Sequence, residues 1–178
     1  RFAAAEGFTE SRFPPRESVA RQDISHPAMA VNLDACIACN LCMRACREVQ
    51  VNDVIGMAFR SDHHAPVFDL DDPMGLSTCV ACGECVEACP TGALMPKSIL
   101  DAQTQVGTRG AETSVASVCP FCGVGCQLEF KVRDGRIAYV EGLDGPANEN
   151  RLCVKGRFGF DYVASPQRLT VPLIRREG

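Results

Sequence analysis

The sequence predicts an α+β fold made of two small units, and three observations lead to this prediction. Twelve cysteines fall into three compact groups within 178 residues, and no cysteine is left over. The chain is 46% apolar but only 6% aromatic, so units of about 60 to 70 residues can bury little apolar surface by themselves. Short alternating stretches between turn residues predict strands. We therefore expect metal ligation to supply much of the folding free energy, and the apo-chain to be largely unfolded.

The cysteine spacing predicts the cofactor. Two groups have the spacing C-x2-C-x2-C-x3-C and begin 43 residues apart; they are Cys36, Cys39, Cys42 and Cys46, then Cys79, Cys82, Cys85 and Cys89. The third group has the spacing C-x2-C-x3-C-x26-C and consists of Cys119, Cys122, Cys126 and Cys153. Four thiolates are what one [4Fe-4S] cluster requires, so the sequence predicts three clusters. A chain with three such clusters carries electrons.

Zinc and disulfides are the competing interpretations of these cysteines. Structural zinc sites usually take two close cysteine pairs separated by a long stretch, whereas here three or four cysteines crowd into eight or eleven residues. Disulfide cysteines would be spread over the loops that they join, but these lie among Ala, Gly and Val. Both alternatives fit the spacing less well than iron–sulfur clusters do.

The chain divides into two units, each preceded by a linker. Residues 1–27 are polar, contain Pro14-Pro15 and are predicted to be a linker. In the first unit, residues 28–100, each cysteine run is expected to be a strand, a cluster loop and a short helix. Between the runs, residues 54–60 and 65–70 are predicted strands of a hairpin closed by residues 61–64. His63 and His64 in this turn, and His26, are interpreted as surface-turn residues rather than metal ligands, because each cluster already has four thiolates.

The second linker and the second unit complete the chain. Residues 101–117 are small and polar and are predicted to be a linker, and the second unit covers residues 118–178. In it, residues 127–132 and 137–140 are predicted strands joined by a tight turn at Asp134-Gly135. A loop over residues 141–150 leads to the last cysteine, and residues 155–163 are predicted to form a short helix.

Charge and hydropathy restrict the partners. No stretch approaches the ~20 apolar residues of a membrane helix. Apart from Phe158 and Phe160, the basic residues lack the interleaved aromatics of a nucleic-acid surface. We therefore expect no membrane and no nucleic-acid partner, and reduced thiolates favour a cytoplasmic location. The net charge is −4, but residues 151–178 hold six basic and two acidic side chains, which gives +4 there and −8 elsewhere. An anionic ligand near the C-terminal segment would meet a matching field, and a solvated tail explains the charge equally well.

The first unit resembles the two-cluster ferredoxin module at the front of several large oxidoreductases. Its C-x2-C-x2-C-x3-C-P run is the bacterial ferredoxin signature, with Arg47 in place of proline in the first copy. In such ferredoxins the fourth cysteine of each run ligates the other cluster. The resemblance therefore assigns Cys36, Cys39, Cys42 and Cys89 to cluster 1, and Cys79, Cys82, Cys85 and Cys46 to cluster 2. The third group, Cys119, Cys122, Cys126 and Cys153, is assigned to cluster 3.

The second unit resembles the start of a molybdopterin-dependent formate dehydrogenase. The resemblance rests on C-P-F-C-G-V-G-C at residues 119–126 and on R-L-C-V-K-G-R-F-G at residues 151–159. With the ferredoxin module upstream, the chain is similar from Ala28 onward to the catalytic α subunit of the cytoplasmic, NAD-dependent, multi-subunit formate dehydrogenases. The resemblance implies a two-cluster [4Fe-4S] ferredoxin-like domain followed by the small [4Fe-4S] domain that opens molybdopterin oxidoreductases.

This resemblance implies a larger enzyme, of which the chain is expected to be a fragment. In the family, the bis-molybdopterin guanine dinucleotide with Mo or W and the formate-binding residues lie downstream, so no catalytic residue is expected here. Electrons from the oxidation of formate to carbon dioxide would pass through the clusters to the flavin and iron–sulfur, NADH-oxidising subunits of the same complex. The alternative is a non-catalytic electron-carrier large subunit of a NADH:quinone oxidoreductase-like complex. That subunit shares the order of the modules but lacks the pterin.

Lys155 is the expected electron-transfer bridge. In the family, the lysine of the Cys-x-Lys motif lies between the cluster and the pterin, and Lys155 follows Cys153 by two residues. A cluster with four thiolates is anionic, so a nearby cation lowers the cost of adding an electron and raises the potential. An ordinary helix lysine is the competing interpretation.

Overall fold

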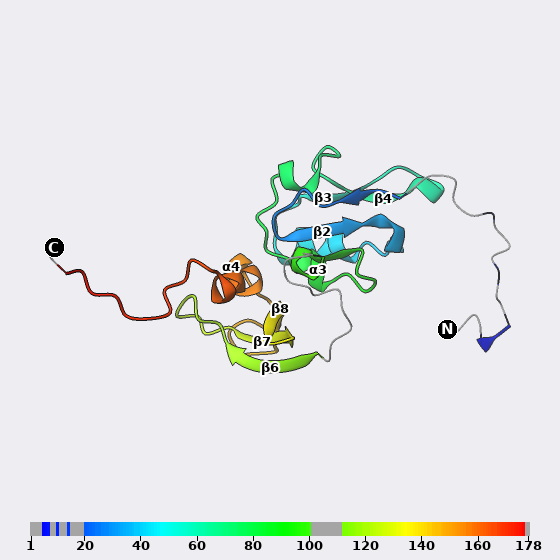
Figure 1. The fold of residues 1–178 in the computed structure, drawn as a ribbon. Coiled ribbons are helices and arrows are strands. Elements are labelled where there is room, and N and C mark those ends of the chain that lie inside the picture. Colours follow the sequence, from blue (N-terminus) through cyan, green and yellow to red (C-terminus); the bar gives the residue numbers. More distant parts are fainter. Residues whose placement is uncertain (1–4, 8–9, 11–13, 15–19, 101–111, 177–178) are drawn as a thin grey trace.

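The computed structural model describes residues 5–7, 10, 14, 20–100 and 112–176, in which short strands and helices form two groups (Figure 1). The first group extends from β1 (Gln22–Asp23) to η5 (Lys97–Ile99), and the second from β6 (Thr113–Val118) to η6 (Gly159–Ala164). This mixture of strands and short helices agrees with the predicted α+β class. Within the described ranges, no helix is long and apolar enough to cross a membrane.

A three-stranded antiparallel sheet belongs to the first group. Its order is β1, β2 (Met29–Asn32) and β5 (Leu94–Pro96), with β2 in the middle. Because β2 has a neighbour on each side, its first three residues are at most 3% exposed. β1 pairs Gln22 with Asn32. The predicted linker over residues 1–27 is therefore wrong at residues 22–23, which extend the sheet.

His26 is a buried residue, so its interpretation as a surface-turn residue is wrong. It is 4% exposed, and its Nδ1 accepts hydrogen bonds from the backbone N–H groups of Ala28 (3.1 Å) and Met29 (3.2 Å). Burial, and then the charge of Lys97, lowers the pKa of His26. The neutral imidazole therefore serves as the acceptor for two backbone amides at the start of β2, where buried N–H groups need a partner.

The predicted hairpin between the cysteine runs is confirmed. β3 (Ile55–Ala58) pairs antiparallel with β4 (Ala65–Phe68), and the 3-10 turn η3 (Ser61–His63) lies between them. His63 is exposed and His64 is half-buried in this turn. Their places agree with the surface-turn interpretation.

Each cysteine run ends in a short helix, as predicted. The first run continues into α2 (Leu41–Arg44) and a wide π-helical turn, η2 (Ala45–Val49), and the second into α3 (Glu84–Glu87). Before the first run stand β2 and the 3-10 turn η1 (Leu33–Ala35), whereas the 3-10 turn η4 (Met74–Leu76) stands before the second. The predicted strand immediately before the second run is therefore wrong, because the strand of that run, β5, follows it.

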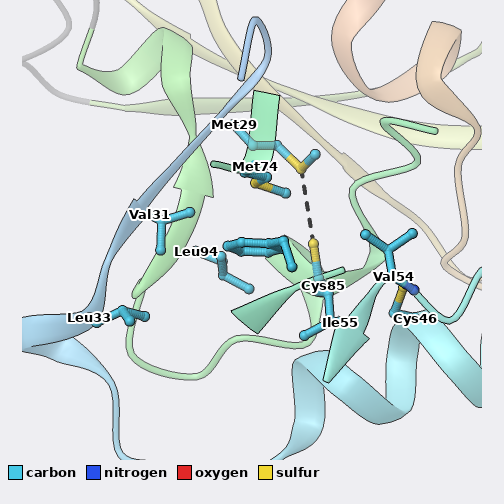
Figure 2. Close-up of a cluster of buried hydrophobic side chains, with 10 residues drawn as sticks. Met29, Val31, Leu33, Cys46, Val54, Ile55, Met74, Cys85 and Leu94 are labelled. Atoms are coloured by element: carbon cyan, nitrogen blue, oxygen red, sulfur yellow. Dashed lines mark hydrogen bonds between the residues drawn. The ribbon is translucent and has the colours of Figure 1, made fainter. Parts of the chain in front are cut away.

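The hydrophobic core of the first group contains two of the cysteines. Met29, Phe68 and Met74 are at most 2% exposed at its centre. Cys46 and Cys85 are buried in the same cluster, and Figure 2 shows the Cys85 sulfur directed at the Met29 sulfur, 4.0 Å away. Because predicted ligands are part of the core, core packing and ligation depend on each other.

The second group is an antiparallel sheet followed by a short helical segment. β6 pairs with β7 (Gln127–Arg133), and β7 pairs with β8 (Arg136–Gly142). The turn between β7 and β8 contains Asp134 and Gly135 with φ of 50° and 74°, as a two-residue type I′ turn requires. α4 (Val154–Phe158) and η6 then follow, in agreement with the predicted helix over residues 155–163.

β6 changes the predicted start of the second unit. The predicted linker covers residues 101–117, but residues 113–117 are strand and pair with β7, while residues 101–111 lie outside the described residues. β6 is an edge strand, and all six of its residues are exposed. Small polar side chains suit such a strand, which explains why its composition predicts a linker.

Candidate iron–sulfur centres

One cavity of the first group is lined by thiols from both cysteine runs. Its cysteines are Cys36, Cys39, Cys42 and Cys89. Burial raises the pKa of the Cys42 thiol to about 11, and the three other thiols are close enough to contribute to the rise. The structure thus brings the fourth cysteine of the second run to the first three cysteines of the first run.

A second cavity has the reciprocal composition. Its cysteines are Cys46, Cys79, Cys82 and Cys85, and apolar residues such as Ile55 and Phe68 complete the wall. Burial raises the pKa of the Cys85 thiol well above its ordinary value, and the neighbouring thiols of Cys79, Cys82, Cys42 and Cys46 add to the effect. Cys42 from the first cavity is among these neighbours, so the two cavities are adjacent.

The short helices explain why the fourth cysteines change sides. Four residues of helix advance the chain by about 6 Å, so Cys46 lies one turn beyond Cys42. Its Sγ accepts a hydrogen bond from the backbone N–H of Val54 (3.4 Å). Cys89, just after α3, accepts one from the N–H of Leu94 (3.5 Å). Since α2 and α3 contact each other, the residues that follow each helix bring the fourth cysteine of its run to the loop of the other run.

Backbone N–H groups point at the thiols in both runs. Ala38 donates to Cys36 Sγ and Ala81 donates to Cys79 Sγ, each at 3.4 Å. Both alanines have positive φ, 52° and 55°, a conformation that is costly for alanine. At Cys89, burial acts to raise the pKa of the thiol, but several donors outweigh it and the pKa is lowered. Donors of this kind stabilise thiolates and help to set cluster potentials.

The third cysteine group lies at the ends of elements of the second sheet. Cys119 follows β6, and its N–H donates to the carbonyl of Cys126 (2.8 Å), which closes the loop between them. Cys153 stands directly before α4. Burial, and then the charges of Cys119, Cys122 and Cys153, raises the pKa of the Cys126 thiol. The four predicted ligands of this group are therefore neighbours.

Asn148, which sequence reasoning missed, organises the loop before the last cysteine. It is 8% exposed, and its Oδ1 accepts from the N–H of Gln127 (2.9 Å). Its Nδ2 donates to the carbonyls of Gln127 (3.0 Å), Leu143 (3.1 Å) and Arg151 (3.1 Å). Asparagine commonly replaces backbone partners in turns, but composition alone does not separate Asn148 from Asn150.

Arg157 was also missed, and it joins the two groups. It belongs to α4, which Figure 1 shows beside α3 and above the β6–β8 sheet. Its side chain is 2% exposed and donates to Cys82 O (3.2 Å), Glu84 Oε1 (3.0 Å) and Glu87 Oε2 (2.5 Å). In the sequence, Arg157 is one of six basic residues in the C-terminal segment, and nothing distinguishes it from the others. The carboxylates that it binds lie about 70 residues earlier in the chain.

The predicted bridge residue Lys155 is exposed in α4, and Cys153 before it is exposed as well. This part of the third group is therefore accessible on the surface of the described chain. Arg157, two residues further along α4, contacts the carbonyl of Cys82, whose residue lines one of the two cavities of the first group.

The residues present fit [4Fe-4S] clusters. Each set offers four thiols, two sets line cavities, and amide donors reach several sulfurs. The cavity of Cys36 also contains the Asn40 Oδ1, which is buried without a hydrogen-bond partner in the protein. With its amide turned over, Asn40 offers an N–H to the cavity, the donor that an anionic cluster takes. Among the described residues, no three Cys, His, Asp or Glu side chains are close enough to hold a single metal ion.

Thiols gathered in fours around short loops define an iron–sulfur electron-transfer protein. Two protein families match the chain: the 4Fe-4S dicluster domain over residues 32–93, and the molybdopterin oxidoreductase Fe4S4 domain over residues 112–165. The second match begins one residue before β6. The chain belongs to the iron–sulfur part of the molybdopterin oxidoreductase family.

Relatives with curated names agree with this family. YrhE of Bacillus subtilis, a formate dehydrogenase by name, is 33% identical over 97% of this chain and 21% of its own length. The NADPH-Fe(3+) oxidoreductase subunit alpha of Geobacter sulfurreducens is 37% identical over 84% of this chain and 17% of its own length. The chain thus spans about a fifth of the length of the curated relatives that it matches.

A solved structure, the NAD+-reducing [NiFe]-hydrogenase in the H2-reduced state, is 29% identical over 54% of this chain and 41% of that chain. Its TM-score is 0.47, which is too low to establish a shared arrangement.

Proposed function

We propose that the chain conducts electrons through three [4Fe-4S] clusters in a formate dehydrogenase. Each cluster, when bound, takes up and releases one electron. The observation that carries the proposal is the gathering of twelve thiols into three sets of four. The proposed sets are Cys36, Cys39, Cys42 and Cys89; Cys79, Cys82, Cys85 and Cys46; and Cys119, Cys122, Cys126 and Cys153.

Formate is the proposed electron source and NAD the proposed acceptor. The name of YrhE and the C-P-F-C-G-V-G-C loop support formate oxidation to carbon dioxide, at a pterin with Mo or W in the larger protein. Flavin and iron–sulfur subunits would pass the electrons to NAD, in the cytoplasm. In this arrangement the exposed Lys155 would face the pterin and add a positive charge beside the third cluster.

The Geobacter relative favours a second candidate function. At 37% identity, a subunit whose name mentions NADPH and Fe(3+) but not formate supports an electron carrier without formate chemistry. The NADH:quinone oxidoreductase-like carrier subunit is a function of this class. Both candidate functions require the same three clusters. They differ in the electron source, which is formate in the dehydrogenase and a reduced nicotinamide in the carrier.

The first experiment counts iron. The chain, loaded with iron and sulfide under anaerobic conditions, is expected to hold about twelve iron and twelve acid-labile sulfide atoms, because each of its three proposed clusters has four of each. Stoichiometric zinc, or fewer than eight irons after careful loading, would contradict the proposal. The chain alone is not expected to oxidise formate, since none of its residues matches the substrate site of the family.

The second experiment separates the two functions in the full-length protein. Formate should reduce the clusters of a formate dehydrogenase, whereas the carrier should respond only to a reduced nicotinamide. The Lys155→Met variant, which keeps the apolar stem, should still bind all three clusters, and its third cluster should become harder to reduce. An unchanged potential with unchanged turnover would leave Lys155 as a surface lysine.

A further inference from the structure

The two cysteine runs have the same local geometry but different side chains at five matched positions, and two of these exchange one apolar side chain for another. The other three change the chemistry of the position. Asn40 and Gly83 follow the second cysteine of their runs, and both have positive φ (64° and 78°). After them, the first run has Leu41 and Arg44, where the second has Glu84 and Glu87. An apolar and a basic side chain are thus exchanged for two carboxylates, and a left-handed asparagine for a glycine.

All three differences meet at Arg157. Glu84 and Glu87 accept hydrogen bonds from its guanidinium at 3.0 and 2.5 Å. A Cβ at Gly83 would lie 2.7 Å from Arg157 Nε and 2.9 Å from the ring of Phe158. A side chain at this position is therefore excluded by α4 itself. Because Leu41 and Arg44 offer no carboxylate, the first run lacks the groups that bind Arg157.

Arg157 also contacts a predicted ligand on each side. Its guanidinium donates to the carbonyl of Cys82, and its backbone N–H donates to the carbonyl of Cys153 (3.1 Å). A buried guanidinium must be paired, and here the acceptors of the side chain come from the first group. The fixed fork of arginine suits three separate acceptors better than the single ammonium of lysine does.

We propose that Arg157 is a positioning residue that seats the third-cluster unit on the second cysteine run, so that the third cluster exchanges electrons with the cluster of Cys82 and not directly with that of Cys39. The proposal rests on the proposed function in that it requires bound clusters. Electron exchange slows steeply with separation, and the bare Gly83 lets α4 approach the Cys82 loop closely. Because only the second run has Gly83, Glu84 and Glu87, the third cluster exchanges its electron with the cluster of Cys82.

The test measures the magnetic coupling between the second and third clusters in the reduced, cluster-loaded chain. Gly83→Asn introduces the residue of the matched position, which tolerates positive φ but collides with Arg157. Arg157→Met, an independent variant, removes the guanidinium and keeps an apolar stem. The control is Arg44→Met, the same substitution at the exposed first-run position that matches Glu87. We expect Gly83→Asn and Arg157→Met to lose the coupling while keeping about twelve irons, and Arg44→Met to keep both.

The outcomes separate this proposal from the proposed function. Wild-type coupling in Gly83→Asn and Arg157→Met, with all iron bound, would overturn the positioning role and leave the three clusters standing. Loss of coupling in Arg44→Met as well would also overturn it, since the effect would not be specific to the second run. If either Gly83→Asn or Arg157→Met loses a cluster during loading, the coupling measured in the other variant tests the positioning role. Low iron in the wild-type chain would instead refute the proposed function.

Discussion

Replacing Asn148 with aspartate is expected to release the third cluster selectively. The two side chains have nearly the same shape, so the new carboxylate can still accept from the N–H of Gln127. The substitution removes the N–H donors that now serve the carbonyls of Gln127, Leu143 and Arg151. It also places a carboxylate against those three oxygens in a buried position.

The magnitude follows from these bonds. The amide has two hydrogens for three carbonyls, and each lost bond costs about 1 to 1.5 kcal/mol, so the loop loses at least about 2 to 3 kcal/mol. If cluster loss proceeds through opening of this loop, its rate should rise about 30- to 150-fold, since 1.4 kcal/mol is a factor of about ten. A buried carboxylate takes up a proton more readily, so the defect should shrink as the pH is lowered.

The assay follows the thiols that become exposed when iron is removed. The loaded chain is incubated with an iron chelator and an alkylating reagent, and labelling of Cys119 and Cys153 is timed by mass spectrometry. Asn150→Asp is the matched control, because Asn150 is exposed in the same loop and its positive φ suits aspartate. Its rate should stay within about twofold of wild type. Equal rates for Asn148→Asp and Asn150→Asp would refute the reasoning.

Two further predictions concern the first group. Cys89→Ala should free the thiols of Cys36, Cys39 and Cys42 for alkylation and leave those of Cys79, Cys82 and Cys85 protected; labelling of the second set instead would show that Cys89 serves its own run. His26 has a lowered pKa in the folded chain, so its contribution to stability is complete above its ordinary pKa of about 6.5 and is lost as the pH falls below that value. His26→Asn keeps a side-chain acceptor for the two amides but cannot take up the proton. Between pH 7.5 and 5.5 its unfolding temperature should therefore fall less than that of wild type, and parallel curves would contradict this account.

Prediction from sequence worked best where the signal is local. The β3–β4 hairpin and the turn at Asp134-Gly135 depend on residues that are neighbours along the chain, and both are present. Prediction from sequence failed at β1 and β6, where it placed linkers, and both are edge strands of small or polar residues. Such strands bury little and therefore show no alternation, so only their hydrogen-bonded partners reveal them.

The candidate sites divide in the same way. Spacing by itself determined how many thiols there are and how they group, because a cluster loop needs its cysteines a few residues apart. Whether His26 is buried, which asparagine binds the loop carbonyls and where Arg157 finds its carboxylates were decided only by the tertiary structure. Arg157 and Glu84 are 73 residues apart. No local pattern encodes such a contact, because it arises when two separately built units bury one charged group between them.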